Sequence, residues 1–416
     1  MAILSLKALK RLGPGLVTGA ADDDPSGIAT YSQIGARFGY TLSWTMLFSM
    51  PLMMVIQAVA ARIGCVSGRG IAHNLRLFYP RPLLAAMVLL LLVANVINLG
   101  ADLAAMAAAV GLLVGGPERL YALLFGVLCV VLEVFIPYAK YASLLKWGTL
   151  SLFAYVAVGL VAGVDWGQAL HALVVPGMKF DAAHTTALIA VLGTTISPYL
   201  FFWQAGQEVE ELRRRHIKPL YRAPQKADAE FRRISLDTIV GMGVSNVIAL
   251  FIIFAAAATL NAKGITNIET SAQAAEALRP VAGPFAFLLF AIGIIATGLM
   301  AVPVLAGSAA YGLAELFGWP QGLDREWHQA GAFYGTIAAA TLGGVALTFV
   351  GLDPVTALYW SAVVNGVLAA PVMAVMMLIA GNSRAMGELT LSWPLRMLGW
   401  LATAVMAVAS VAFFVV

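Results

Sequence analysis

Charged residues are scarce in this chain. Only 11% of its 416 residues are Asp, Glu, Lys or Arg, whereas 61% are hydrophobic. Soluble globular domains have about 25% charged residues, and a water-soluble fold with this composition would expose a large apolar surface. The composition therefore excludes a soluble enzyme and predicts a protein that has the lipid bilayer as its solvent. The formal net charge is only +4, so nucleic acid is not an expected partner.

Cysteine is also rare. The chain has two, Cys65 and Cys129, which are too few for a disulfide framework and lack the spacing of a metal site. Both fall at or inside apolar runs, so we interpret them as packing residues. No cofactor is expected.

Long hydrophobic runs, in contrast, are abundant. A helix needs about 20 apolar residues to cross the hydrocarbon core of a bilayer, and charged residues, Gly and Pro mark where such runs end. The sequence predicts eleven spans, at residues 12–36, 40–63, 83–112, 118–136, 141–163, 184–211, 234–260, 281–312, 331–350, 354–380 and 394–415.

Positive charges predict the orientation of these spans. Short cytoplasmic loops collect Lys and Arg, and twenty of the 25 Lys and Arg fall on one side if the spans alternate. This distribution predicts a multi-pass protein of the plasma (inner) membrane, surrounded by lipid, with the N-terminus in the cytoplasm and the C-terminus outside. A monomeric state is compatible with this architecture.

The first span contains three consecutive aspartates, Asp22, Asp23 and Asp24, followed by Pro25. Each Asp at the centre of a membrane costs about 2.5–3.5 kcal/mol on insertion scales, so the three require a cavity, a cation or both. Pro25 removes a backbone donor and Gly27 tolerates unusual dihedral angles, so we expect the helix to break around residues 24–27. A break frees carbonyl oxygens and amide hydrogens at the two new helix ends.

The three aspartates differ in the role we expect. Asp24 lies next to the break and is the first candidate for a cation ligand. Asp23 is a second candidate, although it could equally cap the helix or face an outer vestibule. For Asp22 we favour the cap or vestibule, because successive helical residues point about 100° apart.

A second break is predicted in the sixth span, where Gly193 to Tyr199 again end in a proline motif. Thr194 and Ser197 would supply oxygen atoms there. Two discontinuous helices five spans apart indicate an inverted-repeat transporter with its site at the bilayer midplane. We therefore expect one all-α transmembrane domain over 1–416, with repeats over about 12–163 and 184–380 and an extra helix over about 394–415.

Other polar residues fall inside the spans. Asn98 and Asp102 share one face of the third span with Asn95, which suits an ion or proton pathway or a buried structural pair. In the sixth span, Gln204 and Glu208 follow Ser197 on one face and would suit an inner vestibule; alternatively, the acidic residues there mark the end of the helix. Weaker candidates, which interhelical hydrogen bonds could explain, are Asn365 and Glu133.

These motifs resemble the Nramp divalent-metal transporters. The similarity is specific over residues 13–72, and it includes the Gly-Pro-Gly at 13–15, Asp24-Pro25, Gln33 to Tyr40, Gln57, Ala61 to Gly64 and Val66 to Gly68. It extends through most of the first six spans. The resemblance implies a LeuT-type fold with discontinuous helices 1 and 6, and transport of Mn²⁺ or Fe²⁺, commonly with protons.

The site motifs depart from those of the family in a consistent direction. The first-helix motif Asp-Pro-Gly-Asn, whose Asp and Asn bind the metal, is here Asp24-Pro25-Ser26-Gly27. The sixth-helix motif Met-Pro-His is replaced by Ser197-Pro198-Tyr199, so the thioether and the histidine implicated in proton movement are absent. Asp102 matches an acid of the family's proton route, whereas Ala105 stands where a second acid is often found. The resemblance thus gives Tyr199 a place in the ion or proton pathway.

The remaining donors are oxygen atoms. Thioether ligands select softer transition metals, whereas carboxylate, hydroxyl and carbonyl oxygens suit Mg²⁺, Ca²⁺ and Mn²⁺. Small side chains at Gly27 and Ser197 predict a roomy pocket, and Mg²⁺ usually keeps several of its waters. The sequence therefore predicts a transporter or facilitator that imports a hard divalent cation by alternating access, Mg²⁺ first and Mn²⁺ second, as in the Nramp-related magnesium transporter branch.

Alternative functions remain open at this point. A proton-coupled Mn²⁺ or Fe²⁺ transporter of the Nramp type, or a Na⁺-coupled carrier of organic solutes, could use the same architecture. An intramembrane aspartyl hydrolase would need two carboxylates brought together, for which Asp24 and Asp102 are formal candidates. A metal-sensing receptor is disfavoured because no large soluble output domain exists.

Overall fold

The structure is a computed structural model that describes residues 14–136, 149–351 and 353–416. The beginnings of the first and fifth predicted spans lie outside the described residues. So do five of the positive charges used to predict the orientation, Lys7, Lys10, Arg11, Lys140 and Lys146.

The first span is broken, as predicted. Helix α2 (Pro14–Asp22) ends before Asp24, and α3 (Pro25–Phe38) begins after it. Asp24 has extended backbone angles, φ −69° and ψ 171°, and its side chain caps α3. Pro25 occupies the first position of α3, where a helix tolerates the missing amide hydrogen. The break therefore follows from an acidic capping residue and a proline that together start a new helix.

The sixth span is broken in a similar way. Helix α11 (Ala182–Thr195) ends just before Ser197, and α12 (Pro198–Arg214) begins with a proline. Ser197 is extended, with φ −85° and ψ 129°. Both predicted breaks are confirmed.

The other helices complete an all-helical fold over the described residues. They are α4 (Trp44–Ser67), α5 (Ile71–Phe78), α6 (Arg81–Val114), α7 (Glu118–Phe135), α9 (Phe153–Val161), α10 (Trp166–Val174), α13 (Ala227–Thr259), α14 (Ser271–Glu276), α15 (Arg279–Ala282), α16 (Ala286–Phe317), α17 (Gly331–Thr348), α18 (Pro354–Ala380), α19 (Ser383–Met386) and α20 (Trp393–Val415).

Eight helical segments of the described chain are long and apolar enough to cross a membrane by length and composition, and one of them is α11 and α12 taken together. A ninth results if Leu150–Val161 and Trp166–Val174, which are bent by 116°, count as one span. Two predicted spans are outside this set. The span 12–36 is divided into the short helices α2 and α3, and the span 118–136 corresponds to the more charged α7. The number of eleven remains a prediction.

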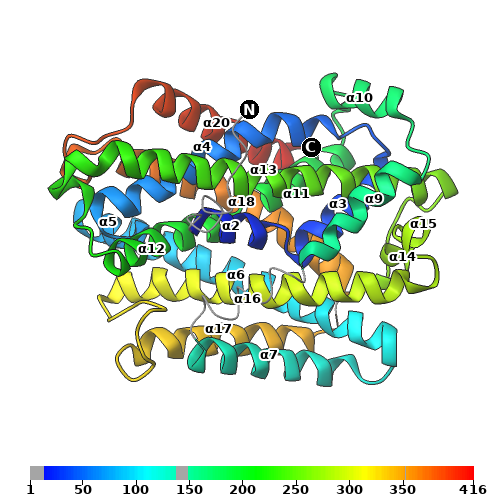
Figure 1. Ribbon diagram of the computed structural model, residues 1–416, viewed down its shortest axis with the longest axis horizontal. Helices are drawn as coiled ribbons and strands as arrows, with labels where there is room; N and C mark the ends of the chain where they lie inside the picture. Colours follow the sequence, from blue (N-terminus) through cyan, green and yellow to red (C-terminus); the bar gives the residue numbers. More distant parts are fainter. Residues whose placement is uncertain (1–13, 137–148, 352) are drawn as a thin grey trace.

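The two broken helices lie at the centre of the molecule (Figure 1). Helix α13 packs along both α2 and α3, α11 packs against α18, and α12 packs against α4. Helices α6 and α16 form a long pair that separates this centre from α7 and α17 at the edge. The backbone around both breaks is therefore surrounded by protein, as polar backbone at membrane depth requires.

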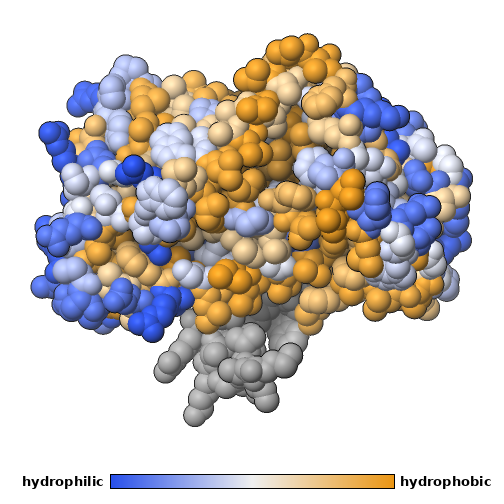
Figure 2. All heavy atoms as spheres, turned by 90° about the horizontal axis from the view of Figure 1, so that it is seen from above, coloured by the Kyte–Doolittle hydropathy of each residue, from blue (hydrophilic) through white to orange (hydrophobic). Residues whose placement is uncertain are grey.

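The surface has the pattern of a membrane protein. On the face shown in Figure 2, hydrophobic residues form a broad belt between two ends that are rich in hydrophilic residues. One end carries the loop between α12 and α13 with its many Arg and Lys, and we call it the basic end; the opposite end carries α10, α14 and α15. Which end faces the cytoplasm remains a prediction.

Candidate metal site

The carboxylate of Asp24 is the centre of the candidate site. Only 2% of this residue is exposed. Its Oδ1 accepts a hydrogen bond from the Gly27 amide at 2.7 Å, which is the capping bond of α3. Its Oδ2 accepts from the Tyr199 hydroxyl at 3.0 Å and from Asn98 Nδ2 at 3.4 Å. Groups from α3, α12 and α6 thus meet at one carboxylate, and two of the predicted pathway residues contact the first metal-ligand candidate.

Asn98 is itself held in place from a fourth helix. The hydroxyl of Ser361, on α18, lies 2.8 Å from Asn98 Oδ1. This contact leaves the amide nitrogen of Asn98 facing Asp24. Asn365 lies one turn further along α18 and is buried, with 2% of its surface exposed.

The second break contributes oxygen atoms beside the first. The Ser197 hydroxyl donates to the Gly193 carbonyl at 2.7 Å and lies 3.1 Å from the Thr194 carbonyl, so it is engaged within its own broken helix. A Cβ atom placed on Gly27 would lie 3.3 Å from Thr194 Oγ1 and from the Asp22 carbonyl oxygen. The structure therefore brings Gly27 and Thr194 together, and the space left by the missing side chain at Gly27 is narrow. The roomy pocket expected from the sequence remains a prediction.

Asp22 and Asp23 turn away from this point toward α13. The Ser245 hydroxyl lies 2.7 Å from Asp22 Oδ2 and 3.0 Å from Asp23 Oδ1. Both aspartates are buried, with 1% and 3% of their surfaces exposed. Sequence reasoning did not single out Ser245, because a single serine within a long apolar span has no periodic signal. The side chain of Asp23 is thus bonded to Ser245 of α13 rather than directed at Asp24.

Asp102 is fully buried on α6, one turn beyond Asn98. Its carboxylate lies beside the backbone amide of Ser26, in the first turn of α3. Its electrostatic neighbours include Asp24. The third-span face predicted from the sequence is therefore directed at the site. Glu133, on α7, is also buried, and it has no hydrogen-bond partner in the described part of the chain.

A polar chain leads from α2 toward the basic end. The Thr18 hydroxyl lies 2.5 Å from Gln204 Oε1, and Gln204 Nε2 donates to Glu208 Oε1 at 3.1 Å. Glu208 then forms an ion pair with Arg233 of α13, which also binds Glu230 at 2.9 Å. The stripe predicted on α12 is thus paired with α13 through Arg233, and its role as a vestibule wall or as the end of the helix remains a prediction.

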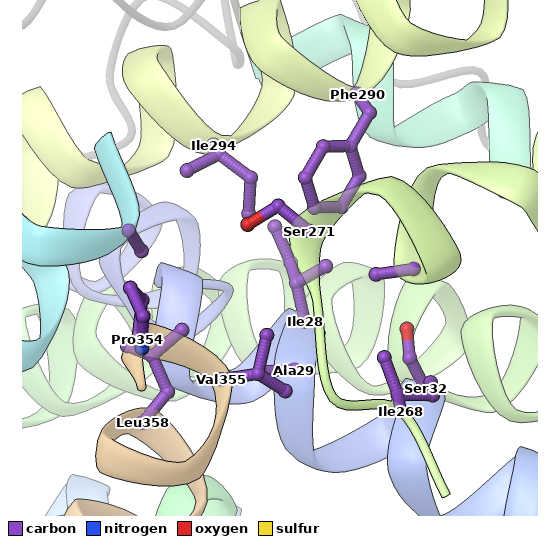
Figure 3. Close-up of a pocket in the computed structure, with 12 residues that line it drawn as sticks. Ile28, Ala29, Ser32, Ile268, Ser271, Phe290, Ile294, Pro354, Val355 and Leu358 are labelled. Carbon is purple, nitrogen blue, oxygen red and sulfur yellow. The ribbon is translucent and has the colours of Figure 1, made fainter. Parts of the chain in front are cut away.

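Cavities lie on the other side of Asp24. A cavity of about 470 Å³ near the opposite end is lined by Gln33, Arg37, Asn267, Tyr359 and Trp360, among others. Next to this cavity, a small apolar pocket of about 10 Å³ is formed by α3, α6, α14, α16, α18 and the segment before α14 (Figure 3). Ile28 and Ala29 of the first turn of α3 line this pocket, as does Ala105. The pocket is therefore apolar at Ala105, the position where the family that this sequence resembles often has a second acid.

Gln33 lines the cavity close to the residues that the cavity shares with the pocket. Its Nε2 donates to Asn267 Oδ1, and its Oε1 accepts from the Ile268 amide, each at 2.8 Å. Ile268 lines both spaces. We call these three residues the Gln33 clamp.

Comparison with known proteins decides the family. Residues 15–416 match the family described as "Natural resistance-associated macrophage protein-like", or Nramp. The chain belongs to the Nramp family. A divalent metal cation transporter MntH from Burkholderia ambifaria is 28% identical over 419 residues, covering 95% of this chain and 86% of the relative. An MntH of Deinococcus radiodurans is 29% identical over 318 residues, covering 72% of this chain and 68% of the relative.

Solved structures confirm the fold. The Eremococcus coleocola manganese transporter, solved with an aromatic bis-isothiourea compound, has a TM-score of 0.78 at 18% identity and covers 99% of this chain and 87% of its own. MhsT in complex with L-phenylalanine, a transporter of the LeuT fold, has a TM-score of 0.64 at 14% identity, with 96% and 97% coverage. The predicted resemblance and the LeuT-type fold with discontinuous helices 1 and 6 are both confirmed.

The ligand set of this Nramp protein is sparse. No group of three His, Cys, Asp or Glu side chains that could hold a metal ion occurs in the described ranges. The candidate ligands beside Asp24 are thus its own carboxylate and neutral oxygen atoms of the two breaks. Such a donor set suits a hard cation that retains part of its hydration shell.

Proposed function

We propose that this protein is a divalent metal cation transporter that works by alternating access. The observation that carries the proposal is the position of Asp24. Its buried carboxylate lies where the first broken helix meets the second, and it contacts α12 through Tyr199 and α6 through Asn98. A carboxylate shared by elements of both repeats can bind an ion and can sense their relative movement.

Mn²⁺ is the first ion to test. The relatives are named divalent metal cation transporters, and one of the two solved structures cited above is a manganese transporter. Mn²⁺ also accepts the oxygen ligands available at Asp24, Thr194 and the broken backbone. These findings support the Nramp-type alternative better than the Mg²⁺-first expectation. Family membership also favours transport over an aspartyl hydrolase.

Mg²⁺ remains a second candidate because of one specific observation. Ser197 and Tyr199 replace the thioether and the imidazole of the Nramp motif, so the site has lost the ligands that favour softer metals. Mg²⁺ binds through few protein oxygens and several retained waters, which fits a site with one carboxylate.

Contacts between helices lie on both sides of the site, and we assign them to the two closures of an alternating-access cycle. On the side of the opposite end, we assign the closure to the Gln33 clamp, whose three residues line the cavity. On the side of the basic end, Thr18 contacts Gln204, and the Gly15 amide donates to Asp237. In the proposed cycle, these two closures open in turn.

The test is uptake into proteoliposomes that contain the purified full chain. Radioactive Mn²⁺ uptake is measured with and without competing Mg²⁺, and an internal dye reports pH. We expect saturable Mn²⁺ uptake that Asp24→Asn lowers at least tenfold, whereas Asp165→Asn, which changes an exposed aspartate on α10's cap, leaves it unchanged. Uptake by Asp24→Asn at the wild-type rate would overturn the proposal. A dependence on Na⁺ and an organic solute without metal flux would favour the solute-carrier alternative.

A further inference from the structure

The Tyr199 hydroxyl lies between two oxygen atoms that a cation would use. It is 3.0 Å from Asp24 Oδ2 and 3.3 Å from the carbonyl oxygen of Ala21. Ala21 belongs to the last turn of α2, where the break frees carbonyl groups from helical hydrogen bonds. Tyr199 is 1% exposed, so its hydroxyl is held there by the surrounding protein. A donor placed between a carboxylate and a carbonyl occupies the position of a cation that bridges them.

Asp24 needs such a donor when no metal is bound. Among the described residues, no ion pair joins Asp24 to a Lys, Arg or His side chain. An isolated buried carboxylate is costly, and hydrogen bonds to the charged form reduce that cost. Gly27 donates from Asp24's own helix, and the Asn98 contact is long, at 3.4 Å. Tyr199 is therefore the closer of the two side-chain donors that reach Asp24 from another helix.

We propose that the Tyr199 hydroxyl substitutes for the metal ion in the cation-free carrier. In that state it donates to Asp24 and stabilises the site without a metal. When a divalent cation binds, the cation takes over this contact, and the hydroxyl moves to a water of the hydration shell. Tyr199 is thus a positioning residue that competes with the ion and allows the unloaded carrier to reorient. This inference rests on the proposed transport function.

The two halves of the transport cycle separate this role from a general structural one. Net uptake into metal-free vesicles requires the unloaded carrier to return, whereas exchange between equal metal pools requires only the loaded carrier to cross. Removal of the hydroxyl should therefore slow net uptake and spare exchange. It should also tighten metal binding, because the cation no longer displaces a hydrogen bond to a charged group. Such a bond can change an equilibrium on the order of tenfold.

The test uses the full chain in proteoliposomes with radioactive Mn²⁺. For Tyr199→Phe we expect a maximal net uptake about tenfold lower, an exchange rate within twofold of the wild type, and a dissociation constant for Mn²⁺ about tenfold lower in detergent. The matched control is Tyr155→Phe. Tyr155 is also buried, and its hydroxyl faces Ser32 rather than Asp24, so net uptake and exchange should both stay at wild-type rates.

Two outcomes would overturn the inference while leaving the proposed function intact. The first is that net uptake and exchange fall equally in Tyr199→Phe. The second is that net uptake, exchange and the dissociation constant for Mn²⁺ all stay at their wild-type values. If Tyr199→Phe does not fold, trifluorotyrosine introduced at position 199 keeps the shape and strengthens the O–H donor. It should weaken Mn²⁺ binding, and tighter binding would count against the inference. Absence of Mn²⁺ transport by the wild type would instead refute the proposed function.

Discussion

The carboxylate of Asp237 accepts a hydrogen bond from the backbone amide of Gly15, with 2.8 Å between Asp237 Oδ2 and the Gly15 nitrogen. This contact joins the first turn of α2 to α13. One turn further, Gly19 packs against the backbone of Gly241, where a Cβ atom would not fit. The first half of the broken helix is therefore fixed to α13 on the side of the basic end.

Loss of this contact should open the structure from the basic end. We expect Asp237→Ala to increase the labelling rate of Cys65 by a maleimide several-fold. Cys65 is buried on α4 next to Gly64, which contacts α12, so the reagent reaches it only when these helices separate. The Cys129→Ala background leaves Cys65 as the single cysteine. Asp228→Ala, which removes an exposed carboxylate from the same helix, is the control, and an equal rate in both variants would show that the Asp237 contact does not hold the closure.

Arg233 is expected to be a major contributor to stability. It pairs with Glu208 and Glu230, which are 0% and 5% exposed. Removing one partner of a buried pair leaves an uncompensated charge and costs about 3–5 kcal/mol. Arg233→Ala should therefore lower the Tm in detergent by several degrees. Arg232→Ala, on the exposed side of the same helix, should change the free energy of unfolding by at most about 0.5 kcal/mol, and similar losses in the two variants would contradict the assignment.

A thioether at position 197 should change the metal preference. Ser197 makes no capping hydrogen bond to α12, so Ser197→Met should leave the start of that helix intact. Sulfur ligands favour softer metals, and we expect the ratio of Cd²⁺ to Mn²⁺ uptake to rise on the order of tenfold. Ser197→Leu has a similar volume without sulfur and should not raise the ratio. Equal ratios in the Met and Leu variants would place Ser197 away from the ion.

The Gln33 clamp should control access from the opposite end. Gln33→Leu keeps the size of the side chain but loses both hydrogen bonds to Asn267 and Ile268. We expect this change to expose the apolar pocket, so that a cysteine at Ile28, introduced in a chain without native cysteines, reacts several-fold faster with an impermeant thiol reagent. The control is Thr186→Val, which alters the wall of the same cavity. An unchanged rate in Gln33→Leu would mean that the clamp does not close this route.

Several parts of the site could be predicted from the sequence because their cause is local. Asp24-Pro25 and Ser197-Pro198 break their helices through capping and a missing backbone donor, whatever the rest of the fold does. The face formed by Asn98 and Asp102 follows from helical spacing alone. These features correspond to the structure.

The partners of those residues could not be predicted in the same way. Ser245 contacts Asp22 and Asp23 across more than 220 positions of sequence, and a serine within a long apolar span has no periodic signal. Glu208 was open to two interpretations, and its ion pair with Arg233 depends on how α12 packs against α13. Tyr199 was placed on the pathway by resemblance, but its position between Asp24 and Ala21 depends on the approach of two separate breaks.

The sequence alone determined three things: that this chain spans a bilayer, at which positions its helices break, and that a carboxylate lies at the first break. It could do so because composition, proline and helical period act over short distances. Only the tertiary structure decided which groups satisfy that carboxylate and which helix contacts lie on either side of it. The reason is physical: hydrogen bonds and ion pairs between helices depend on how the helices approach and rotate, and that arrangement is fixed by packing over the whole fold.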